Sequence, residues 1–451
     1  MKKLNLVIIG TGPAASRVVG KCGRAGWKVG IFDRLPYGGV CALRGCSPKK
    51  VFVKAAELRN WMVRMEETYS FDSVPQVNWQ KLVAFKHRFT DPITPHAENA
   101  YEEMGLVHGV ETASFQSPKS IKAGDEIYEA EHIVVATGSE SRQLGIPGEE
   151  HLMHSEAFMD MDELPENILF IGAGYISMEL SHFSARLGAK VKLIEALDRP
   201  LQNFDPDMVE KLVERGKEDG IDIDVNTKVK SIEKRGDHDY VVQAEKDGET
   251  VEYRANLLVH GAGRVPSVNS LDLEKGDVYY SEKEGIAVKP TLQSVSNPRV
   301  YAAGDVSATP TPPLTPVANY EGRIVAKNLL EDAEYEAEYG VVPTVAFTIP
   351  SIASVGLSEA KAREENRNID VRQGDFSDQN TVRKIGENCA HYKIIIDKES
   401  DRILGAHLVG PNAHSDINLF TLAINQKATT HDYKANLFTF PTFGHDTRGM
   451  V

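Results

Sequence analysis

Two copies of one strand-turn-helix pattern restrict the fold of this chain more than any other feature of its sequence. The first copy is an apolar run from Leu4 to Ile9 that leads into GTGPAA and a helical pattern, and the next strand pattern ends in Asp33. In this arrangement Gly10 permits a tight turn, Gly12 lets a phosphate approach the backbone, and Ala15 packs the helix on the strand. The acid then hydrogen-bonds a ribose. The pattern therefore predicts a dinucleotide-binding unit.

The second copy starts at Asn167 to Ile171, continues with GAGYIS, and its following strand pattern ends in Glu195. Two fingerprints indicate two dinucleotides, and a flavin with a nicotinamide is the natural pair. A carboxylate at Glu195 would hydrogen-bond the ribose hydroxyls of NADH and repel the 2′-phosphate of NADPH. No basic cluster follows it immediately, although Arg199 is near. We therefore expect NADH and leave NADPH open.

Cys41 and Cys46 lie five residues apart in GGVCALRGCSPKK. On a regular helix this offset turns the side chains about 140° apart and separates them by about 7.5 Å along the axis, more than a disulfide prefers. A bridge would therefore need a distorted turn, which Gly45 and Pro48 could help to form. A bridge held in such a turn is easily reduced, which favours a redox-active pair. Two unrelated buried thiols are the alternative.

The composition predicts a soluble globular protein without a nucleic-acid, membrane or metal partner. The formal net charge of -14 disfavours binding to nucleic acid or anionic lipid. No stretch approaches the roughly 20 apolar residues of a membrane span, and MKKLNLVIIGTG lacks a small-residue cleavage site. Four cysteines form neither a secreted disulfide framework nor a zinc site, and we expect Cys22 and Cys389 to be packing residues. We expect a cytoplasmic protein.

The remaining patterns predict an α/β chain with a further domain at its C-terminal end. Val51 to Tyr69 and Gln80 to Met104 have helical periodicity, and HIVVATGS and VYAAGDV each indicate a buried strand that ends in a small-residue turn. An acidic stretch from Glu331 to Glu338 suggests a boundary, and longer strand patterns follow it. The predicted fold is α/β, with two Rossmann-like dinucleotide-binding domains and a C-terminal α+β domain.

These motifs, in this order, resemble those of the flavin-dependent pyridine nucleotide–disulfide oxidoreductases, the branch of glutathione reductase, dihydrolipoamide dehydrogenase and mercuric reductase. The resemblance covers nearly the whole chain and rests on GGVCALRGCSPKK, HIVVATGS, GAGYISME, GAGRVP, YAAGDV and LTPVA. It implies a homodimer whose active site is completed by the partner subunit. The domains it implies are 1–146 with 265–337 for FAD, 147–264 for NAD(P), and 338–451 for dimerisation.

The resemblance also implies a path for electrons, from NADH through FAD to a Cys41–Cys46 disulfide and then to the substrate. Cys46 would be the thiolate that faces the flavin, and Cys41 the interchange thiol that attacks the substrate. Lys49 matches the family lysine beside the flavin, and Glu179 matches its salt-bridge partner. Tyr175 matches the aromatic residue that covers the flavin and yields to nicotinamide.

The cofactor-binding residues carried over by motif come from both fingerprints and from the other family motifs between and after them. Thr315 is expected to cap a helix that Pro316 opens, with the positive helix end directed at the reduced flavin ring. The full set is Gly10, Gly12, Ala15, Asp33, Gly39, Lys50, Thr137, Gly138, Gly172, Gly174, Tyr175, Ile176, Glu195, Gly263, Arg264, Gly304, Asp305, Thr315, Pro316 and Ala318.

The C-terminal tail departs from the family pattern. The disulfide reductases carry a His-Pro-Thr-x-x-Glu motif whose histidine moves the thiol proton, whereas this tail reads FPTFGHD, with Phe440 in the histidine position and His445 in the glutamate position. Three readings stay open. In the first, His445 takes over proton transfer, with Asp446 or another carboxylate to orient it. In the second, His445 is a surface residue. In the third, the substrate has a leaving group that departs as a stable anion without an acid, as a persulfide or polysulfide could.

Arg44, between the two cysteines, is a second departure. A guanidinium there could lower a thiolate pKa or hold an anionic substrate, and it could equally face a cofactor phosphate or solvent.

We therefore predict a homodimeric, FAD-containing, NAD(P)H-dependent oxidoreductase that acts on a disulfide, persulfide or related sulfur substrate, with His445 among its candidate catalytic residues. One alternative is a flavin dehydrogenase that reduces quinones or similar acceptors without using the cysteines. The other is a non-catalytic protein that binds FAD and NADH as a redox sensor.

Overall fold

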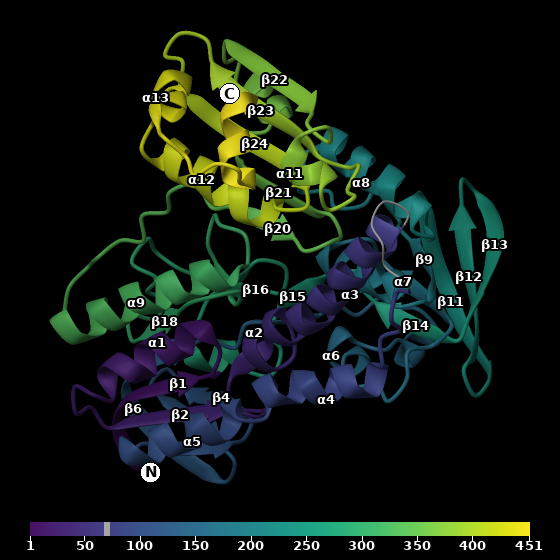
Figure 1. The fold of residues 1–451 in the computed structure, drawn as a ribbon. Coiled ribbons are helices and arrows are strands. Elements are labelled where there is room, and N and C mark those ends of the chain that lie inside the picture. The colour runs from purple at the N-terminus through teal and green to yellow at the C-terminus, as the bar shows by residue number, and fades with distance from the viewer. Residues whose placement is uncertain (67–72) are drawn as a thin grey trace. The chain divides into compact units, whose positions relative to one another are not determined.

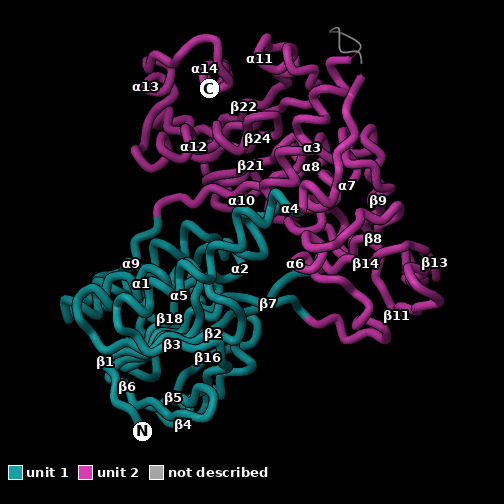
Figure 2. The backbone as a smooth tube through the Cα atoms, turned by 60° about the horizontal axis from the view of Figure 1, so that its bottom comes forward, with its two compact units in different colours: residues 1–49, 84–142, 263–339 teal, residues 50–83, 143–262, 340–451 magenta. Residues whose placement is uncertain are grey.

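The computed structural model describes residues 1–66 and 73–451. The chain forms two compact units, each assembled from three separate segments (Figure 2). Unit 1 comprises residues 1–49, 84–142 and 263–339, and unit 2 comprises residues 50–83, 143–262 and 340–451. The division passes through two helices, α3 (Cys46–Glu66) and α4 (Trp79–Thr90).

A seven-stranded sheet forms the centre of unit 1. Its strand order is β3-β2-β1-β6-β5-β4, and β18 (Val300–Ala302) also pairs with β6. The strand β1 (Lys2–Ile9) is parallel to both of its neighbours, β2 (Val29–Asp33) and β6 (Glu126–Val135). The carboxyl end of β1 therefore lies between those of β2 and β6. In parallel sheets of this kind, ligands bind beyond the carboxyl ends of the strands.

Two helices of unit 1 lie against each other, α1 (Pro13–Cys22) and α9 (Thr315–Glu331) (Figure 1). They approach closely because Gly322 on α9 has no side chain, and a Cβ there would come within 2.4 Å of the carbonyl oxygen of Ala14. The other elements of unit 1 are α2 (Gly39–Leu43), α5 (Ile93–Glu103), β3 (Val107–Val110), β4 (Ala113–Ser117), β5 (Ser120–Ala123), β7 (Ser139–Ser141), β15 (Arg264–Pro266), β16 (Tyr280–Ser281), β17 (Gly285–Ala287) and β19 (Ser307–Ala308).

The described residues of unit 2 form three sheets. A parallel sheet has the order β10-β9-β8-β14, an antiparallel sheet the order β11-β12-β13, and a five-stranded antiparallel sheet the order β20-β21-β24-β23-β22. The bounds of the strands are β8 (Asn167–Ile171), β9 (Lys190–Ile194), β10 (Ile221–Asp224), β11 (Thr227–Gly236), β12 (Asp239–Lys246), β13 (Glu249–Ala255), β14 (Leu257–His260), β20 (Thr344–Ala346), β21 (Ser351–Gly356), β22 (Ile369–Asp375), β23 (His391–Asp397) and β24 (Ile403–Gly410).

Helices complete unit 2, and an aromatic core joins them to the parallel sheet. Phe52, Phe158 and Phe183 are fully buried, with the rings of Phe52 and Phe183 stacked at 5.4 Å. Trp79 packs on the same cluster. The helices are α6 (Ser155–Phe158), α7 (Tyr175–Arg186), α8 (Pro206–Glu218), α10 (Glu359–Glu364), α11 (Asn380–Arg383), α12 (Ala413–Asn425), α13 (Thr430–Ala435) and α14 (Phe443–Asp446).

The predicted α/β fold class is confirmed, and one element prediction is wrong. Gln80 to Met104 is not one helix but two, α4 and α5, because Pro92 lies between them and cannot continue a helix. The helical pattern at 51–69 is confirmed as far as Glu66, and its last residues lie outside the described range. None of the helices in the described ranges has the length and apolarity needed to cross a membrane.

Candidate active site and dinucleotide-binding turns

Cys41 and Cys46 lie on two different helices of the chain. Cys41 is in α2, which ends at Leu43, and Cys46 is the first residue of α3. A Cβ at Gly45 would lie 3.0 Å from the carbonyl oxygen of Val40, so the connection is too tight for a larger residue. The distorted turn predicted from the spacing is confirmed, and it lets two side chains five residues apart face each other.

The Thr315 hydroxyl lies beside both sulfurs. Its Oγ1 donates a hydrogen bond to Cys41 Sγ at 3.0 Å and is 3.8 Å from Cys46 Sγ. The prediction that Thr315 caps its helix is wrong, because α9 begins at Thr315 with Leu314 in the cap position and no side-chain cap. The hydroxyl is therefore available to the thiols, next to the positive end of a 17-residue helix.

No disulfide joins the four cysteines in this structure. The hydrogen bond with Cys46 and burial both raise the pKa of the Cys41 thiol, while the Thr315 hydroxyl and the Lys49 ammonium lower it. Burial lowers the pKa of Lys49 to about 8, against the opposing effect of the two sulfurs. The raised pKa favours the thiol form of Cys41, and the Thr315 hydroxyl and the Lys49 ammonium are the groups that favour its thiolate.

The first fingerprint forms an open turn at the end of β1. Gly10 has φ +104°, and a Cβ there would lie 2.3 Å from the carbonyl oxygen of Ala136. Gly12 has no heavy atom within 4 Å of its Cβ position, and it precedes α1 without a side-chain cap. Uncapped amides beside open space suit a phosphate, so these residues fit the pyrophosphate of FAD.

Asp33 and Gly39 complete this turn. The Asp33 carboxylate accepts hydrogen bonds from the amide and the hydroxyl of Thr11, at 2.9 and 2.7 Å. Gly39 has φ +71°, and a Cβ there would lie 2.6 Å from the Cα of Gly12. Ala15 is fully buried on α1, as predicted for the residue that packs this helix.

A second group of predicted residues meets at β7 and β15. Ser139 Oγ donates to Asp305 at 2.9 Å and accepts from Arg264 Nε at 3.1 Å. Thr137 Oγ1 donates to the carbonyl of Ser267 at 2.8 Å, and Gly138, with φ +68°, has no atom near its Cβ position. Ser139, the last residue of HIVVATGS, was not among the predicted site residues.

The second fingerprint repeats the first in unit 2. Gly172 has φ +90°, and a Cβ there would lie 2.6 Å from the carbonyl oxygen of Gly261. Gly174 precedes α7 without a side-chain cap, and Tyr175 and Ile176 form its first turn. The Glu195 carboxylate accepts from the amide of Ala173 at 2.6 Å, the contact that Asp33 makes with Thr11 in unit 1. These residues fit a second dinucleotide.

The guanidinium of Arg199 is hydrogen-bonded to backbone carbonyl groups of its own loop. Its guanidinium donates to the carbonyl oxygens of Pro200, Leu201, Gln202 and Phe204, at 2.7 to 3.4 Å. It therefore shapes the loop before α8. The sequence could not reveal this use, because it depends on how the loop closes around the side chain.

Glu179 is a buried carboxylate on α7, with 2 % of its side chain exposed. It accepts a hydrogen bond from the amide of Phe347 at 2.7 Å and lies 4.0 Å from Lys50 Nζ. The Lys50 ammonium also lies over the Phe347 ring. Within unit 2, Glu179 therefore forms an ion pair with Lys50. Its pairing with Lys49, a residue of unit 1, stays a prediction. Tyr175 is hydrogen-bonded to the Thr344 hydroxyl.

The tail that departs from the family pattern places an apolar ring at the surface. Phe440 is 73 % exposed, and its ring packs edge-on at 5.0 Å against that of His445. His445 Nδ1 is buried, lies 3.6 Å from Asp446 Oδ1, and makes no hydrogen bond to any described residue. Asp446 accepts a hydrogen bond from the Thr381 hydroxyl instead. Proton transfer by His445 stays a prediction.

Comparisons with known proteins cover both units. The family model described as pyridine nucleotide-disulphide oxidoreductase matches residues 4–322, and the model for the dimerisation domain of the same family matches residues 342–450. The dihydrolipoyl dehydrogenase of Haloferax volcanii is 30% identical over 451 residues, which is 97% of this chain and 93% of the relative. That of Thermus scotoductus is 31% identical over 98% of this chain and 95% of its own. A mercuric reductase of Staphylococcus aureus is 31% identical over 95% of this chain and 78% of its own.

Proposed function

Since this chain belongs to the pyridine nucleotide-disulphide oxidoreductase family, we propose that it uses the Cys41 and Cys46 pair to reduce a sulfur–sulfur bond. Family membership makes it an FAD-dependent oxidoreductase that exchanges electrons with a nicotinamide nucleotide and carries a dimerisation domain. The observation that supports the proposal is the meeting of both sulfurs at the Thr315 hydroxyl. We also propose a homodimer with FAD-binding (1–146, 265–337), NAD(P)-binding (147–264) and dimerisation (338–451) domains.

The proposed reaction consists of two thiol–disulfide exchanges. The Cys41 thiolate attacks one sulfur of the substrate, the S–S bond breaks, and the other sulfur leaves as an anion. The Cys46 thiolate then attacks Cys41 Sγ, which releases the second product and forms the Cys41–Cys46 disulfide. The residues of the first fingerprint would hold FAD, which would supply the two-electron link between the nicotinamide nucleotide and this disulfide. In sum, one NAD(P)H and one proton convert one S–S bond into two S–H groups and leave NAD(P)⁺.

Within this reaction the chain's own groups hold charge and protons at the sulfurs. The Thr315 hydroxyl donates to Cys41 Sγ and so stabilises its thiolate. Phe440 has no proton to give to a leaving thiolate. Leaving groups of low pKa depart fastest in such exchanges. We therefore propose persulfides or polysulfides as the substrate class, ahead of disulfides whose leaving thiolates need a proton.

We further propose NADH as the physiological reductant. Glu195 directly follows β9, at the position that meets an adenosine ribose in this fold, and the charge of its carboxylate disfavours a 2′-phosphate. Arg199, the nearest cation considered for that phosphate, donates to four backbone carbonyls. Its charge is thus engaged in the loop.

The test is steady-state consumption of NADH, with and without oxygen, against glutathione disulfide, lipoamide, glutathione persulfide and a quinone. We expect turnover of the persulfide, its loss in Cys41→Ser, and its retention in Cys22→Ala, which changes a buried cysteine on α1. Turnover of glutathione disulfide or lipoamide would mean that another proton donor exists, and His445→Ala should then abolish it.

Two other outcomes would contradict the proposal. Quinone turnover that Cys41→Ser leaves intact would support a flavin dehydrogenase that does not use the cysteines. Reduction of FAD by NADH without turnover of any acceptor would support a redox sensor.

A further inference from the structure

Glu321, on α9 in unit 1, is a fully buried carboxylate with four hydrogen-bond donors. One oxygen accepts from the amide of Gly304 at 2.6 Å and from the Ser307 hydroxyl at 3.4 Å. The other accepts from the Tyr339 hydroxyl at 2.7 Å and from the Thr309 hydroxyl at 3.2 Å. An ionised carboxylate offers about four acceptor positions. Three of these donors lie within 3.2 Å, while the Ser307 hydroxyl also donates to the carbonyl of Gly304 at 2.7 Å.

Burial raises the pKa of the Glu321 carboxyl, and the four hydrogen bonds act against this rise. Placing a carboxylate in the interior costs free energy unless hydrogen bonds compensate for the lost water. An apolar side chain would fill the same space without that cost. The charge therefore needs an explanation other than packing.

The strongest of these contacts holds the turn that carries Asp305. Gly304 comes directly before Asp305 and has φ +79°. Glycine has no Cβ to restrict its backbone angles, so contacts with neighbouring residues must hold this conformation. Its amide donates to Glu321, and its Cβ position lies 3.4 Å from the Cβ of Ala318, one turn earlier on α9. The turn thus rests on α9 and is hydrogen-bonded to it. A shift of the turn would break the shortest hydrogen bond to this buried carboxylate.

The same helix carries the hydroxyl that contacts the thiols. Thr315 is the first residue of α9, and its Oγ1 donates to Cys41 Sγ at 3.0 Å. Glu321 lies on this helix as well, so one rigid element relates the Gly304–Asp305 turn to Cys41. Tyr339 holds the opposite oxygen of the carboxylate and limits its rotation.

We propose that Glu321 is a positioning residue for the cofactor, which fixes the Gly304–Asp305 turn in the conformation that binds FAD, with Tyr339 as its anchor. This inference rests on the proposed function, because it assumes that Asp305 binds FAD.

The test measures the affinity of the FAD-stripped protein for added FAD, from the quenching of FAD fluorescence. Glu321→Gln keeps the shape of the side chain but turns an amide N–H group toward donors. We expect the Kd for FAD to rise about 10- to 100-fold, as for the loss of a hydrogen bond to a charged group. Tyr339→Phe removes one donor of four, and we expect a rise of about three- to tenfold.

Leu329→Ala is the matched control. Leu329 is buried on the same helix, two turns beyond Glu321, and its truncation weakens packing without touching the turn. We expect its Kd for FAD to stay within about twofold of the wild-type value, since no contact of the turn is changed.

Unchanged FAD affinity in both Glu321→Gln and Tyr339→Phe would overturn this inference alone. An equal loss of affinity in Leu329→Ala would overturn it too, because general destabilisation would then explain the effect. Failure of the wild-type protein to bind FAD would overturn the proposed function, and this inference with it.

Discussion

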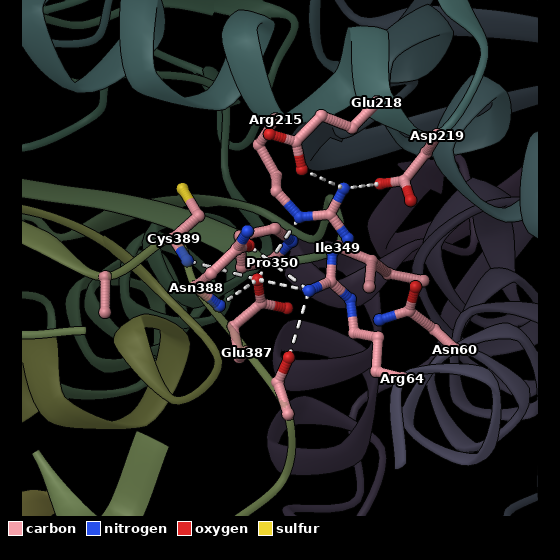
Figure 3. Close-up of polar contacts among 12 residues, drawn as sticks. Asn60, Arg64, Arg215, Glu218, Asp219, Ile349, Pro350, Glu387, Asn388 and Cys389 are labelled. Carbon is pink, nitrogen blue, oxygen red and sulfur yellow. Dashed lines mark hydrogen bonds and ion pairs between the residues drawn. The ribbon is translucent and has the colours of Figure 1, made fainter. Parts of the chain in front are cut away.

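Replacing Glu387 by Gln should destabilise the protein far more than the same replacement at Glu218, although both carboxylates bind Arg215. Figure 3 shows this cluster, in which Arg215 and Arg64 converge on Glu387. The side chains of Arg215 and Glu387 are 2 % and 1 % exposed, whereas Glu218 is 58 % exposed. The two variants thus remove the same kind of charge from the same arginine, once inside the protein and once at its surface.

The size of the effect follows from the contacts of Glu387. Its Oε1 lies 3.3 Å from Arg215 Nε and 3.7 Å from Arg64 Nη1, and it accepts from the amides of Asn388 and Cys389. Breaking a buried pair costs about 3–5 kcal/mol, because the remaining charge stays buried without a partner. Arg215 keeps Asp219 at 2.6 Å, so we expect a loss of about 3 kcal/mol, at the lower end of that range.

Glu218→Gln is the control, with an expected loss below about 1 kcal/mol, the usual value for an exposed ion pair. Urea denaturation followed by tryptophan fluorescence and far-UV circular dichroism measures the free energy of unfolding where the two transitions coincide. Trp79, buried in the core of unit 2, reports on the unit that contains this cluster. Losses of equal size in the two variants would refute the reasoning, since burial would then not set the strength of the pair.

Three further predictions concern the dinucleotide, a buried acid and the thiols. Glu195→Gln should raise the KM for NADH about tenfold and weaken the preference for NADH, because the proposed charged hydrogen bond between Glu195 and the ribose is lost. The ratio of kcat/KM for NADH to that for NADPH measures this preference, and an unchanged ratio would contradict the prediction. Burial and the nearby Asp446 raise the pKa of Asp416 to about 7, so the folded protein binds more protons than the unfolded chain at intermediate pH and loses stability as pH rises toward 7. Asp416→Asn should therefore stabilise the protein by about 2–3 kcal/mol more at pH 8 than at pH 5. Urea denaturation at pH 5 and at pH 8 measures this, and an equal increase in the free energy of unfolding at both would disprove it. Thr315→Val should raise the apparent pKa for alkylation of Cys41 by about one unit, whereas Thr315→Ser should not, because only valine lacks the hydroxyl. A pH profile of iodoacetamide labelling would show equal shifts in both variants if the hydroxyl had no effect.

The sequence alone determined the features that depend on neighbouring residues. The apolar run before Gly10 forms β1, and Gly10 and Gly172 adopt the positive φ angles that a tight turn requires. Gly45 interrupts the helix between Cys41 and Cys46. These outcomes are readable because backbone conformation and strand or helix periodicity are set within a few residues.

Contacts between side chains that are far apart in the sequence became visible only in the tertiary structure. Thr315 reaches Cys41 from 274 positions away, although its local sequence suggested only a helix cap. The sequence around Glu321 does not indicate a buried charge. From the sequence Arg199 was a candidate phosphate ligand, whereas in the structure it is hydrogen-bonded to backbone carbonyls of its loop. A side chain's partners depend on how separate elements pack, and packing is a property of the whole fold that a local pattern does not contain.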